Sequence, residues 1–407
     1  MEGIIGNFFS LFTTGPAYDI LRIVGKLWFV WLPLMLVFIF WDVWIVYVRT
    51  RWMEGNSWVL LEIKPPREIA KSPRAMELVF NSLHSYRKGN LIEQFWNGFV
   101  SMWYSLEIAG INGDVHFFVR TTTFSRNLIE SQLYAQYPDI EITEVDDYTK
   151  AIPKELPNDT WKIWGTEFKL TKPDAYPIKT YVDFKLDDGL EEEEKTDPLS
   201  SLIEFLGSLK PGEQIWFQIL IRGAGNDWQA EGEKLIEKLL GRKKFDMQTK
   251  GEVFMPVPSP GESDVLKAIE RSISKTGYKT GMRLVYVAKK DVYTPASFSA
   301  FLGILKQFNS LQLNGLAPTN STSIDYFFPE WRSIKRQKRL VRMFRSRSYF
   351  YPPYGSFLRE NAGRVPPFIL NTEELATIFH LPGYTAETPT FQRLEARKGE
   401  PPPNLPI

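Results

Sequence analysis

The sequence has no cysteine and only three histidines, and these shortages exclude several kinds of chemistry. Without cysteine there is no disulfide, no thiolate zinc site, no iron–sulfur cluster and no cysteine nucleophile. His84, His116 and His380 lie far apart along the chain. The sequence also lacks a Walker-type Gly-Lys-Ser/Thr loop, a G-x-S-x-G elbow and a dinucleotide-binding fingerprint. We therefore predict that the protein is not an enzyme and holds no cofactor and no metal.

The chain also lacks a large excess of either charge. Lys and Arg number 49 against 48 Asp and Glu, a net charge of +1, which excludes a protein coated with nucleic acid along its whole length. Its 407 residues, 43% hydrophobic and 24% charged, are typical of folded protein divided into two or three domains. The acidic run 187–197 lacks the ligand spacing of a calcium loop, so we expect a solvated loop there.

One long hydrophobic run is present, at residues 27–48, where Asp42 is the only charged residue. As a helix these 22 residues extend about 33 Å, enough to cross a hydrocarbon core of about 30 Å. A buried core helix is the alternative, but a helix that is apolar on every side needs lipid or a very large protein around it. We therefore predict a single transmembrane helix over 27–48, preceded by an N-terminal segment over 1–26.

Four residues of this span are predicted to meet the membrane or its surface. Trp28, Trp31 and Trp44 lie toward its two ends, where aromatic rings favour the membrane interfaces. A carboxylate at the bilayer centre costs about 2.5–3.5 kcal/mol. Asp42 lies nearer the end of the span, so we expect it to reach water or to be neutral, with a contact inside an oligomer as the alternative.

The charges beside the span predict its orientation. Four basic residues follow it and two precede it, namely Arg49, Arg51, Lys64 and Arg67 against Arg22 and Lys26. Because cytoplasmic flanks are richer in Lys and Arg, we expect a single-pass protein of the cell's inner membrane with its C-terminal domain in the cytoplasm. The apolar run is too long and starts too late for a cleaved signal peptide, so we expect a retained anchor.

After the span, two halves repeat one pattern of strands and helices. In the first half, residues 58–150, strands are predicted at 58–64, 101–110, 113–121 and 140–146, and helices at 72–86 and 125–137. In the second half, residues 158–330, strands are predicted within 161–185 and at 214–222, 282–290 and 324–328, and helices at 198–208 and 295–309. The order βαββαβ predicts an α+β fold of two ferredoxin-like units. Two amphipathic stretches within 227–275 interrupt the second unit as a helical insertion.

A basic aromatic segment follows at 331–367 and carries the strongest local charge in the chain. Its eight basic residues are Arg332, Lys335, Arg336, Lys338, Arg339, Arg342, Arg345 and Arg347. Such a run neutralises the phosphates of DNA or of anionic lipid, and aromatic rings beside it stack on unpaired bases. The alternative is a solvated helix face with Ile334, Val341 and Phe344 docked on the sheet. We favour an anionic partner.

The junction and Pro-rich tail at 368–407 carry a family resemblance. The run LNTEELAT at 370–377, followed by Phe379, His380, Leu381 and Pro382, resembles the junction that leads into the motor domain of type IV secretion and conjugation ATPases. QIWFQILIR at 214–222 with the following GAGNDWQAEGEKL resembles part of their N-terminal, membrane-anchored, non-motor region. Where that family continues into its Walker-bearing motor, this sequence stops, as in a bacterial family that lacks the nucleotide-binding domain.

The resemblance implies either a stand-alone anchor, with a separately encoded cytoplasmic ATPase that docks at the junction, or a chain truncated before its motor domain. The candidate docking residues are Leu375, Ile378, Phe379, His380, Leu381 and Pro382. By default such an apolar cluster packs on its own domain. Our first hypothesis is thus an ATPase-less anchoring component of a type IV secretion-like DNA or protein transfer system, assembled as a homo-oligomeric ring. The alternative is a membrane scaffold that binds anionic lipid and has no role in transfer.

Overall fold

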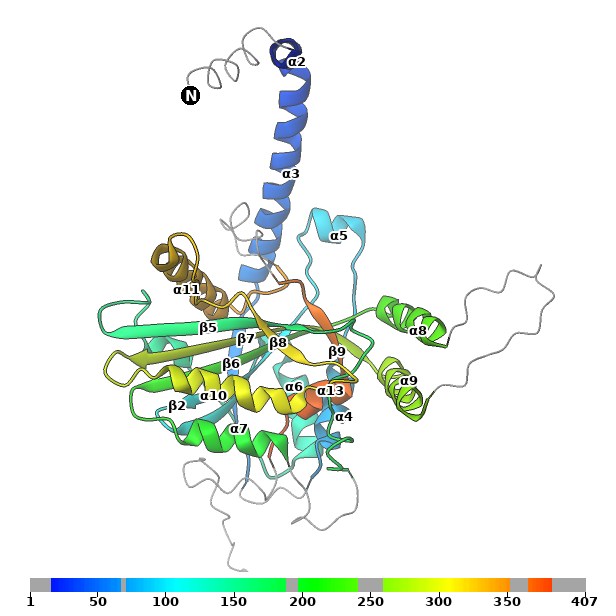
Figure 1. Cartoon of the computed structure of the whole chain (residues 1–407), viewed down its shortest axis with the longest axis vertical. Helices are drawn as coiled ribbons and strands as arrows, with labels where there is room; N and C mark the ends of the chain where they lie inside the picture. The colour runs from blue at the N-terminus through cyan, green and yellow to red at the C-terminus, as the bar shows by residue number, and fades with distance from the viewer. Residues whose placement is uncertain (1–15, 67–70, 188–196, 241–258, 352–364, 383–407) are drawn as a thin grey trace, which may run out of the picture. The chain divides into compact units, whose positions relative to one another are not determined.

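The fold is described from a computed structural model, in which residues 16–66, 71–187, 197–240, 259–351 and 365–382 are described (Figure 1). The acidic loop at 188–196, the first part of the N-terminal segment and the Pro-rich tail from 383 lie outside these residues, as does part of the basic aromatic segment. The chain divides into two compact units. One contains the apolar helix and the segment Gly89–Val100, and the other contains the sheet with its helices.

The first unit is built on α3, Trp28–Glu54, which follows the short helix α2, Pro16–Lys26. The predicted span is helical from Trp28, with Leu27 as the N-cap, and α3 continues six residues past Val48 because Arg49–Glu54 contain no helix breaker. Helix α3 is long and apolar enough to cross a membrane. The short helix α5, Leu91–Phe95, belongs to the same unit.

The second unit contains one antiparallel sheet. Its strands are β1 Trp58–Lys64, β2 Tyr104–Ile111, β3 Asp114–Thr122, β4 Glu141–Val145, β5 Trp161–Leu170, β6 Glu213–Gly223, β7 Gly277–Lys289, β8 Leu316–Thr319 and β9 Phe368–Asn371. The order across the sheet is β4-β1-β3-β2-β6-β7-β5-β8, with β9 paired to β7. The two predicted halves therefore do not form separate sheets, because β2 pairs with β6 along Tyr104–Ile111.

The two halves share one strand order. In the first half the strands lie in the order β4-β1-β3-β2. In the second half they lie in the order β8-β5-β7-β6, so in both halves the fourth strand is followed by the first, the third and the second. The hairpin between β2 and β3 turns at Asn112 and Gly113, both at positive φ, as their sequence predicts. The α+β class and the antiparallel sheet are thus confirmed.

One predicted strand is wrong. Residues 324–328 lie outside regular secondary structure, and the strand that closes the second half is β8, a few residues earlier. Aromatic and β-branched residues favour strands in a sequence pattern, but β8 already occupies the edge beside β5. Strand β7 also begins earlier than predicted, at Gly277, because β9 pairs with Gly277–Thr280.

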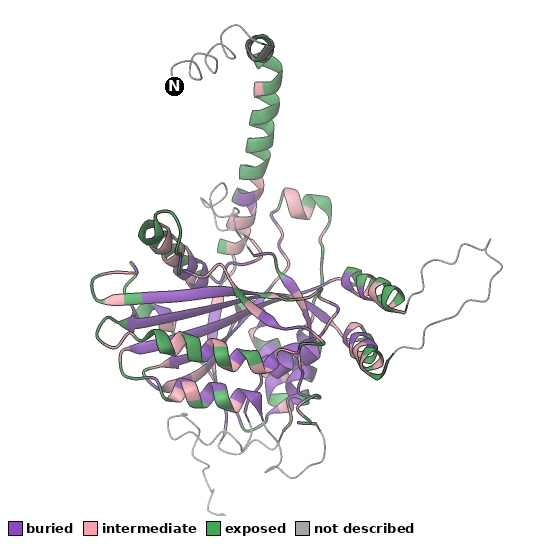
Figure 2. Cartoon of the chain, in the orientation of Figure 1, coloured by how far each residue is buried: buried purple, intermediate pink, exposed green. Residues whose placement is uncertain are grey.

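Helices cover both faces of the sheet. One face is covered by α4 Arg74–Leu83, α6 Thr123–Gln136, α7 Pro198–Gly207, α10 Pro295–Leu305 and α13 Thr372–Ile378. The other face is covered by α11, Pro329–Arg345. Each face of the sheet has its own hydrophobic core, and alternate residues of a strand point to the two faces. Ile215 and Phe217 face the first group of helices, and Trp216 faces α11. Figure 2 shows the strands buried between these layers.

The predicted helical insertion is confirmed as a pair of helices between β6 and β7. They are α8, Asp227–Leu239, and α9, Pro260–Ile273. Helix α9 begins with a capping box, in which the Ser259 hydroxyl accepts from the Glu262 N–H and the Glu262 carboxylate accepts from the Ser259 N–H.

Candidate functional site

Helix α11 carries most of the predicted anion-binding residues, and its register divides them. Pro329 starts the helix after Phe328, whose φ of 57° is left-handed and stops the chain from being helical any earlier. Leu340, Val341 and Phe344 are buried against the sheet. Their spacing puts one face of the C-terminal half of α11 in the core and leaves the N-terminal half outside it.

The N-terminal half of α11 presents cations without carboxylate partners. Arg332 lies over the ring of Tyr326 at 5.1 Å and Lys335 over the ring of Trp331 at 4.7 Å. Lys338 is exposed on the same helix. Within the described part of the chain, no carboxylate forms an ion pair with any of these three cations. Their charge is therefore available to an anionic partner.

Exposed aromatic rings surround these cations, and the sequence analysis missed them as a surface. Phe327 and Phe328 are 81% and 77% exposed, and Trp331 is 63% exposed. Large rings are seldom left this open without a partner. We call the set Tyr326, Phe327, Phe328, Trp331, Arg332, Lys335 and Lys338 the aromatic–basic surface. A useful signal in the sequence was Pro329, which marks the start of a helix immediately after the two phenylalanines.

Other predicted anion-binding residues form hydrogen bonds within the domain instead. Arg336 donates to the carbonyl of Ser321 at 2.8 Å. Arg345 donates to the carbonyls of Thr149, Ile152, Pro153 and Lys154, at 2.9 to 3.2 Å. Arg339 is half-buried and Arg342 is exposed, and both interact with other residues of the chain. The eight basic residues therefore do not form one continuous binding surface.

Arg347 lies in the interior, only 1% exposed, within what we call the buried charge centre: Glu107, Asp147 and Arg347. Its guanidinium donates to both carboxylate oxygens of Glu107, at 3.0 and 3.1 Å, and to both oxygens of Asp147. Glu107 also accepts from the Ser105 hydroxyl, the Tyr148 hydroxyl and the Gln218 amide. Such saturation is what a buried ion pair needs to be stable.

Electrostatics in this centre favour the charged forms of all three groups. Burial alone would raise the pKa of Glu107, but the charge and hydrogen bonds of Arg347 outweigh it, and the pKa lies below its usual range. Asp147 behaves likewise: burial opposes ionisation, and its bonds to Arg347 lower the pKa. Burial would lower the pKa of Arg347, but Glu107 and Asp147 raise it. The centre is a structural clamp between β2, the start of η1 (Tyr148–Ala151) and the end of α11.

The predicted docking residues of the junction lie in the core. Leu375, Ile378, Phe379 and Leu381 are at most 1% exposed. Helix α13 begins at a capping box in which the Asn371 side chain accepts from the Glu374 N–H and the Glu374 carboxylate accepts from the Asn371 N–H. Pro382 is buried with the rest. The placement favours the alternative in which the cluster packs on its own domain, since a partner cannot reach these side chains from solvent.

His380 is a structural residue at the end of α13. Its Nδ1 lies 2.9 Å from the Ala376 carbonyl and its Nε2 lies 3.0 Å from a carboxylate oxygen of Asp197. Burial would lower the pKa of His380, but the Asp197 charge raises it. Asp197 also caps α7 by accepting from the Leu199 N–H. This pair fastens the junction to α7.

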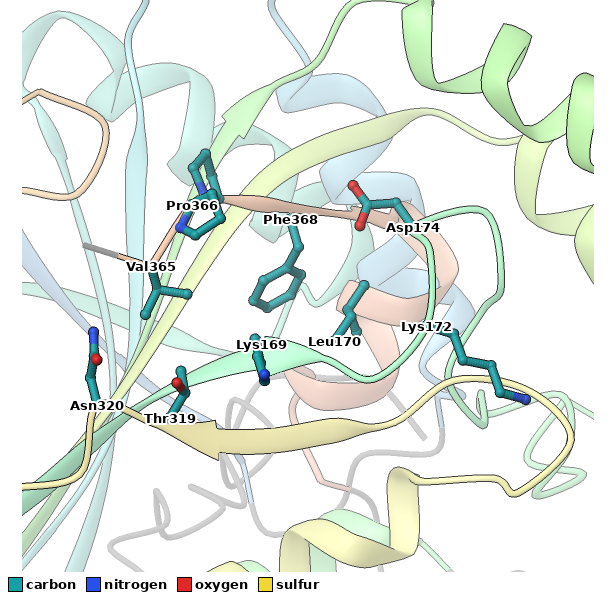
Figure 3. A pocket seen from close by; sticks show the side chains of 10 residues that line it. Lys169, Leu170, Lys172, Asp174, Thr319, Asn320, Val365, Pro366 and Phe368 are labelled. Atoms are coloured by element: carbon teal, nitrogen blue, oxygen red, sulfur yellow. The ribbon is translucent and has the colours of Figure 1, made fainter. Parts of the chain in front are cut away.

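A pocket of about 450 Å³ lies where the sheet divides (Figure 3). Strand β5 pairs with β7 only as far as Glu167, beyond which β9 pairs with β7 instead. Lys169, Asp174, Asn320 and Phe368 are among the residues that line the gap. Burial raises the pKa of Asp174 to about 6, although the Ile369 N–H donates to its carboxylate. Neither a nucleophile–base pair nor a metal-binding cluster is found among the described residues at this pocket.

The predicted membrane residues lie on α3. Trp28 and Trp31 are 57% and 41% exposed, and Asp42 is exposed. Trp44 is half-buried, and its indole N–H donates to the Phe95 carbonyl at 3.0 Å. The helix therefore presents its apolar side chains outward along most of the predicted span, as a lipid-facing helix does, and buries only Val46 and Val48 near its end (Figure 2).

These features define a class of protein: one apolar helix long enough to span a membrane, joined to a mixed α+β domain with an antiparallel sheet. Residues 50–393 match the family described as a domain of unknown function, DUF8128, and the chain belongs to that family. No curated protein matches the chain.

Proposed function

We propose that this protein is a non-enzymatic, single-span membrane component of a type IV secretion-like transfer system, and that its aromatic–basic surface contacts the DNA that is transferred. In this proposal α3 anchors the chain in the inner membrane and the α+β domain lies in the cytoplasm. The observation that carries the proposal is the N-terminal half of α11, where cations that form no ion pair with the described carboxylates lie beside exposed rings.

The chemistry of that surface suits single-stranded nucleic acid. Arg332, Lys335 and Lys338 supply positive charge for phosphates, and Phe327, Phe328 and Trp331 supply ring faces for bases. Stacking contributes about 1–3 kcal/mol per base and does not depend strongly on sequence. A surface of this composition therefore suits a nucleic-acid strand that moves past it better than it suits one fixed base sequence.

The fold supports the same proposal. We infer that each half of the sheet is a ferredoxin-like unit, since both halves repeat one strand order and both have a helix in each crossover. The resemblance of the junction to secretion ATPases implies a separate ATPase as partner and a ring of identical subunits. Because the six junction residues are buried, the proposal places the ATPase contact elsewhere on the domain surface.

The test exchanges the three cations for acids in the full chain, held in detergent micelles. Arg332→Glu, Lys335→Glu and Lys338→Glu together are expected to abolish binding of single-stranded DNA, measured by fluorescence anisotropy. The matched control reverses three exposed lysines of α8 and α9 at Lys234, Lys238 and Lys267, and should bind as the wild type does. Equal loss in both variants, or no binding by the wild type, would contradict DNA contact. Turnover of ATP by the purified wild type would contradict the non-enzymatic part.

A second function, attachment to anionic lipid, is favoured by the same exposed rings. Phenylalanine and tryptophan next to lysine are typical of surfaces that lie in a membrane interface. Vesicles of phosphatidylcholine with and without phosphatidylglycerol separate the two functions. If the triple variant loses binding to anionic vesicles but keeps DNA binding, the lipid function is correct and the transfer proposal is wrong.

A further inference from the structure

The segment Gly89–Val100, which contains α5, has an exposed apolar tip beside the candidate membrane helix. Leu91 and Ile92 are 72% and 69% exposed, and Trp96 is 65% exposed. Phe95 and Phe99 of the same segment pack on α3. A short helix that presents three large apolar side chains outward is unusual on a water-facing surface.

The segment follows one face of α3. Phe95 stacks near Trp41 with ring centroids 5.7 Å apart, and Trp96 lies near Trp44 at 5.6 Å. Phe99 lies near Trp52 at 5.7 Å. Between them, Gly98 lies so near the Val48 carbonyl that a Cβ there would be 2.2 Å from its oxygen. Helix positions 41, 44, 48 and 52 form one stripe, so the segment lies along α3 rather than crossing it.

This packing fixes the height of Phe95 and Trp96 along α3. Arg49 is the first charged residue after the apolar run, and Trp41 precedes it by eight residues. At about 1.5 Å per residue, Phe95 therefore lies about 12 Å toward the apolar end from Arg49. Trp96 contacts Trp44, five residues before Arg49, and by the same measure lies about 7.5 Å from it, within the 5–10 Å insertion of an interfacial helix. Asp42 lies near this level and pairs with no charged residue among those described. An ionisable side chain without such a partner is costly deep in the acyl region, so Asp42 favours a position at the boundary between headgroups and acyl chains.

Several backbone polar groups of the segment are hydrogen-bonded within it, as an environment with little water requires. The Asn90 and Glu93 side chains satisfy each other's N–H groups at 2.9 and 2.8 Å. The N–H groups of Trp96 and Asn97 donate to the Ile92 carbonyl, and the Gln94 amide donates to the Gly89 carbonyl. Polar groups that enter a bilayer must be satisfied internally in this way.

We propose that Gly89–Val100 is a second membrane element, in which Leu91, Ile92 and Trp96 insert into the acyl–headgroup boundary of the leaflet where α3 ends. This inference rests on the proposed membrane anchor. The chain enters the segment through Arg87-Lys88, and cations at the base of an inserted tip favour an anionic leaflet. The segment fixes the rotation and depth of α3, which a lone apolar helix leaves open.

Because the chain has no cysteine, a single introduced cysteine can be labelled uniquely. The full chain is reconstituted in vesicles of phosphatidylcholine and phosphatidylglycerol, and a fluorophore is attached at Leu91→Cys or, separately, at Ile92→Cys. Both side chains are exposed, so neither change removes a core contact. Quenching by lipids that carry a nitroxide at a shallow acyl position measures insertion.

Two further positions calibrate the experiment. Phe38→Cys, in the middle of the span, should be quenched by deep nitroxides, and Leu311→Cys, a fully exposed leucine of the other unit, serves as the chemical match. We expect shallow quenching at least severalfold stronger at 91 and 92 than at 311. No quenching at 91 and 92 with strong quenching at 38 would overturn this inference and leave the anchor intact. Absence of quenching at 38 would overturn the anchor itself.

Discussion

The two ends of α11 carry the same kind of side chain in opposite surroundings. Near its N-terminus, Lys335 and Lys338 are exposed with no carboxylate partner among the described residues. Just past its C-terminus, Arg347 is 1% exposed and bonded to two carboxylates. The difference teaches that a run of positive charge is not one functional unit. The buried end stabilises the domain, and in our proposal the open end binds DNA.

The same contrast extends to a second buried arginine. Arg283 on β7 is fully buried, pairs with Glu167 at 3.3 Å and donates to the carbonyls of Met343 and Ser348. Arg283 thus fastens the end of α11 to the sheet from β7, and Arg347 does so from just past the helix terminus. Two buried arginines, Arg283 and Arg347, therefore hold the C-terminal end of α11 on the sheet.

The largest expected effect comes from removing one partner of the buried charge centre. Glu107→Ala leaves Arg347 buried without its main carboxylate, and we expect a loss of about 3–5 kcal/mol in the free energy of unfolding. Chemical denaturation in detergent micelles, followed by near-UV circular dichroism, measures it. The control is Glu144→Ala, which removes a surface carboxylate that pairs with Arg126 and should cost less than about 1 kcal/mol. Similar losses in both variants would show that the centre is not a clamp.

A smaller effect, with a pH signature, is expected from Asp147→Asn. Charged hydrogen bonds contribute about 1.5–3 kcal/mol, so the variant should be less stable than the wild type at neutral pH by about that amount. The folded state holds the pKa of Asp147 below its ordinary value of 3.8. Its stabilising contribution is therefore present above that value and is lost as the pH falls through the lower folded-state pKa.

The unfolding free energies of Asp147→Asn and the wild type should therefore become equal in acid. Unfolding free energies measured from neutral pH down to below the ordinary pKa of Asp147 test this. A difference between Asp147→Asn and the wild type that stays constant across that range would mean that the Asp147 charge is not what stabilises the centre.

The smallest effect on stability is expected at the open end of α11. Arg332→Glu, Lys335→Glu and Lys338→Glu together should change the unfolding free energy by about 1 kcal/mol or less, because they remove two exposed cation–π contacts and no ion pair formed among the described residues. Arg332→Ala, Lys335→Ala and Lys338→Ala together, which leave a weaker DNA binding measurable, should lower the salt dependence of that binding by about 2 in log–log slope, as expected for three lost phosphate contacts. A large loss of stability would erase the distinction between the two ends.

Local patterns in the sequence predicted the elements whose signals are local. Strand β1 was predicted with the bounds it has, and Asn112-Gly113 fixed the first hairpin. Residues 324–328 have strand-forming side chains, but an edge position is decided by which strand pairs with β5, and the pattern cannot contain that information.

The division of the basic run could not be predicted, because its cause is remote in sequence. Glu107 lies 240 residues before Arg347, and nothing near Arg347 shows that it is buried. The α5 segment was missed for another reason, since five helical residues give no periodicity. Its capping pair, Asn90 and Glu93, followed by Phe95 and Trp96, was the available signal.

Attachment to the membrane through α3 is the claim on which both proposals depend, and extraction of cell membranes tests it most directly. Membranes from cells that express the full chain are washed with alkaline carbonate and then with high salt, and the protein is followed in pellet and supernatant. We predict that it stays in the pellet through both washes and is released only by detergent. Release into the supernatant by carbonate or by salt would contradict a spanning helix.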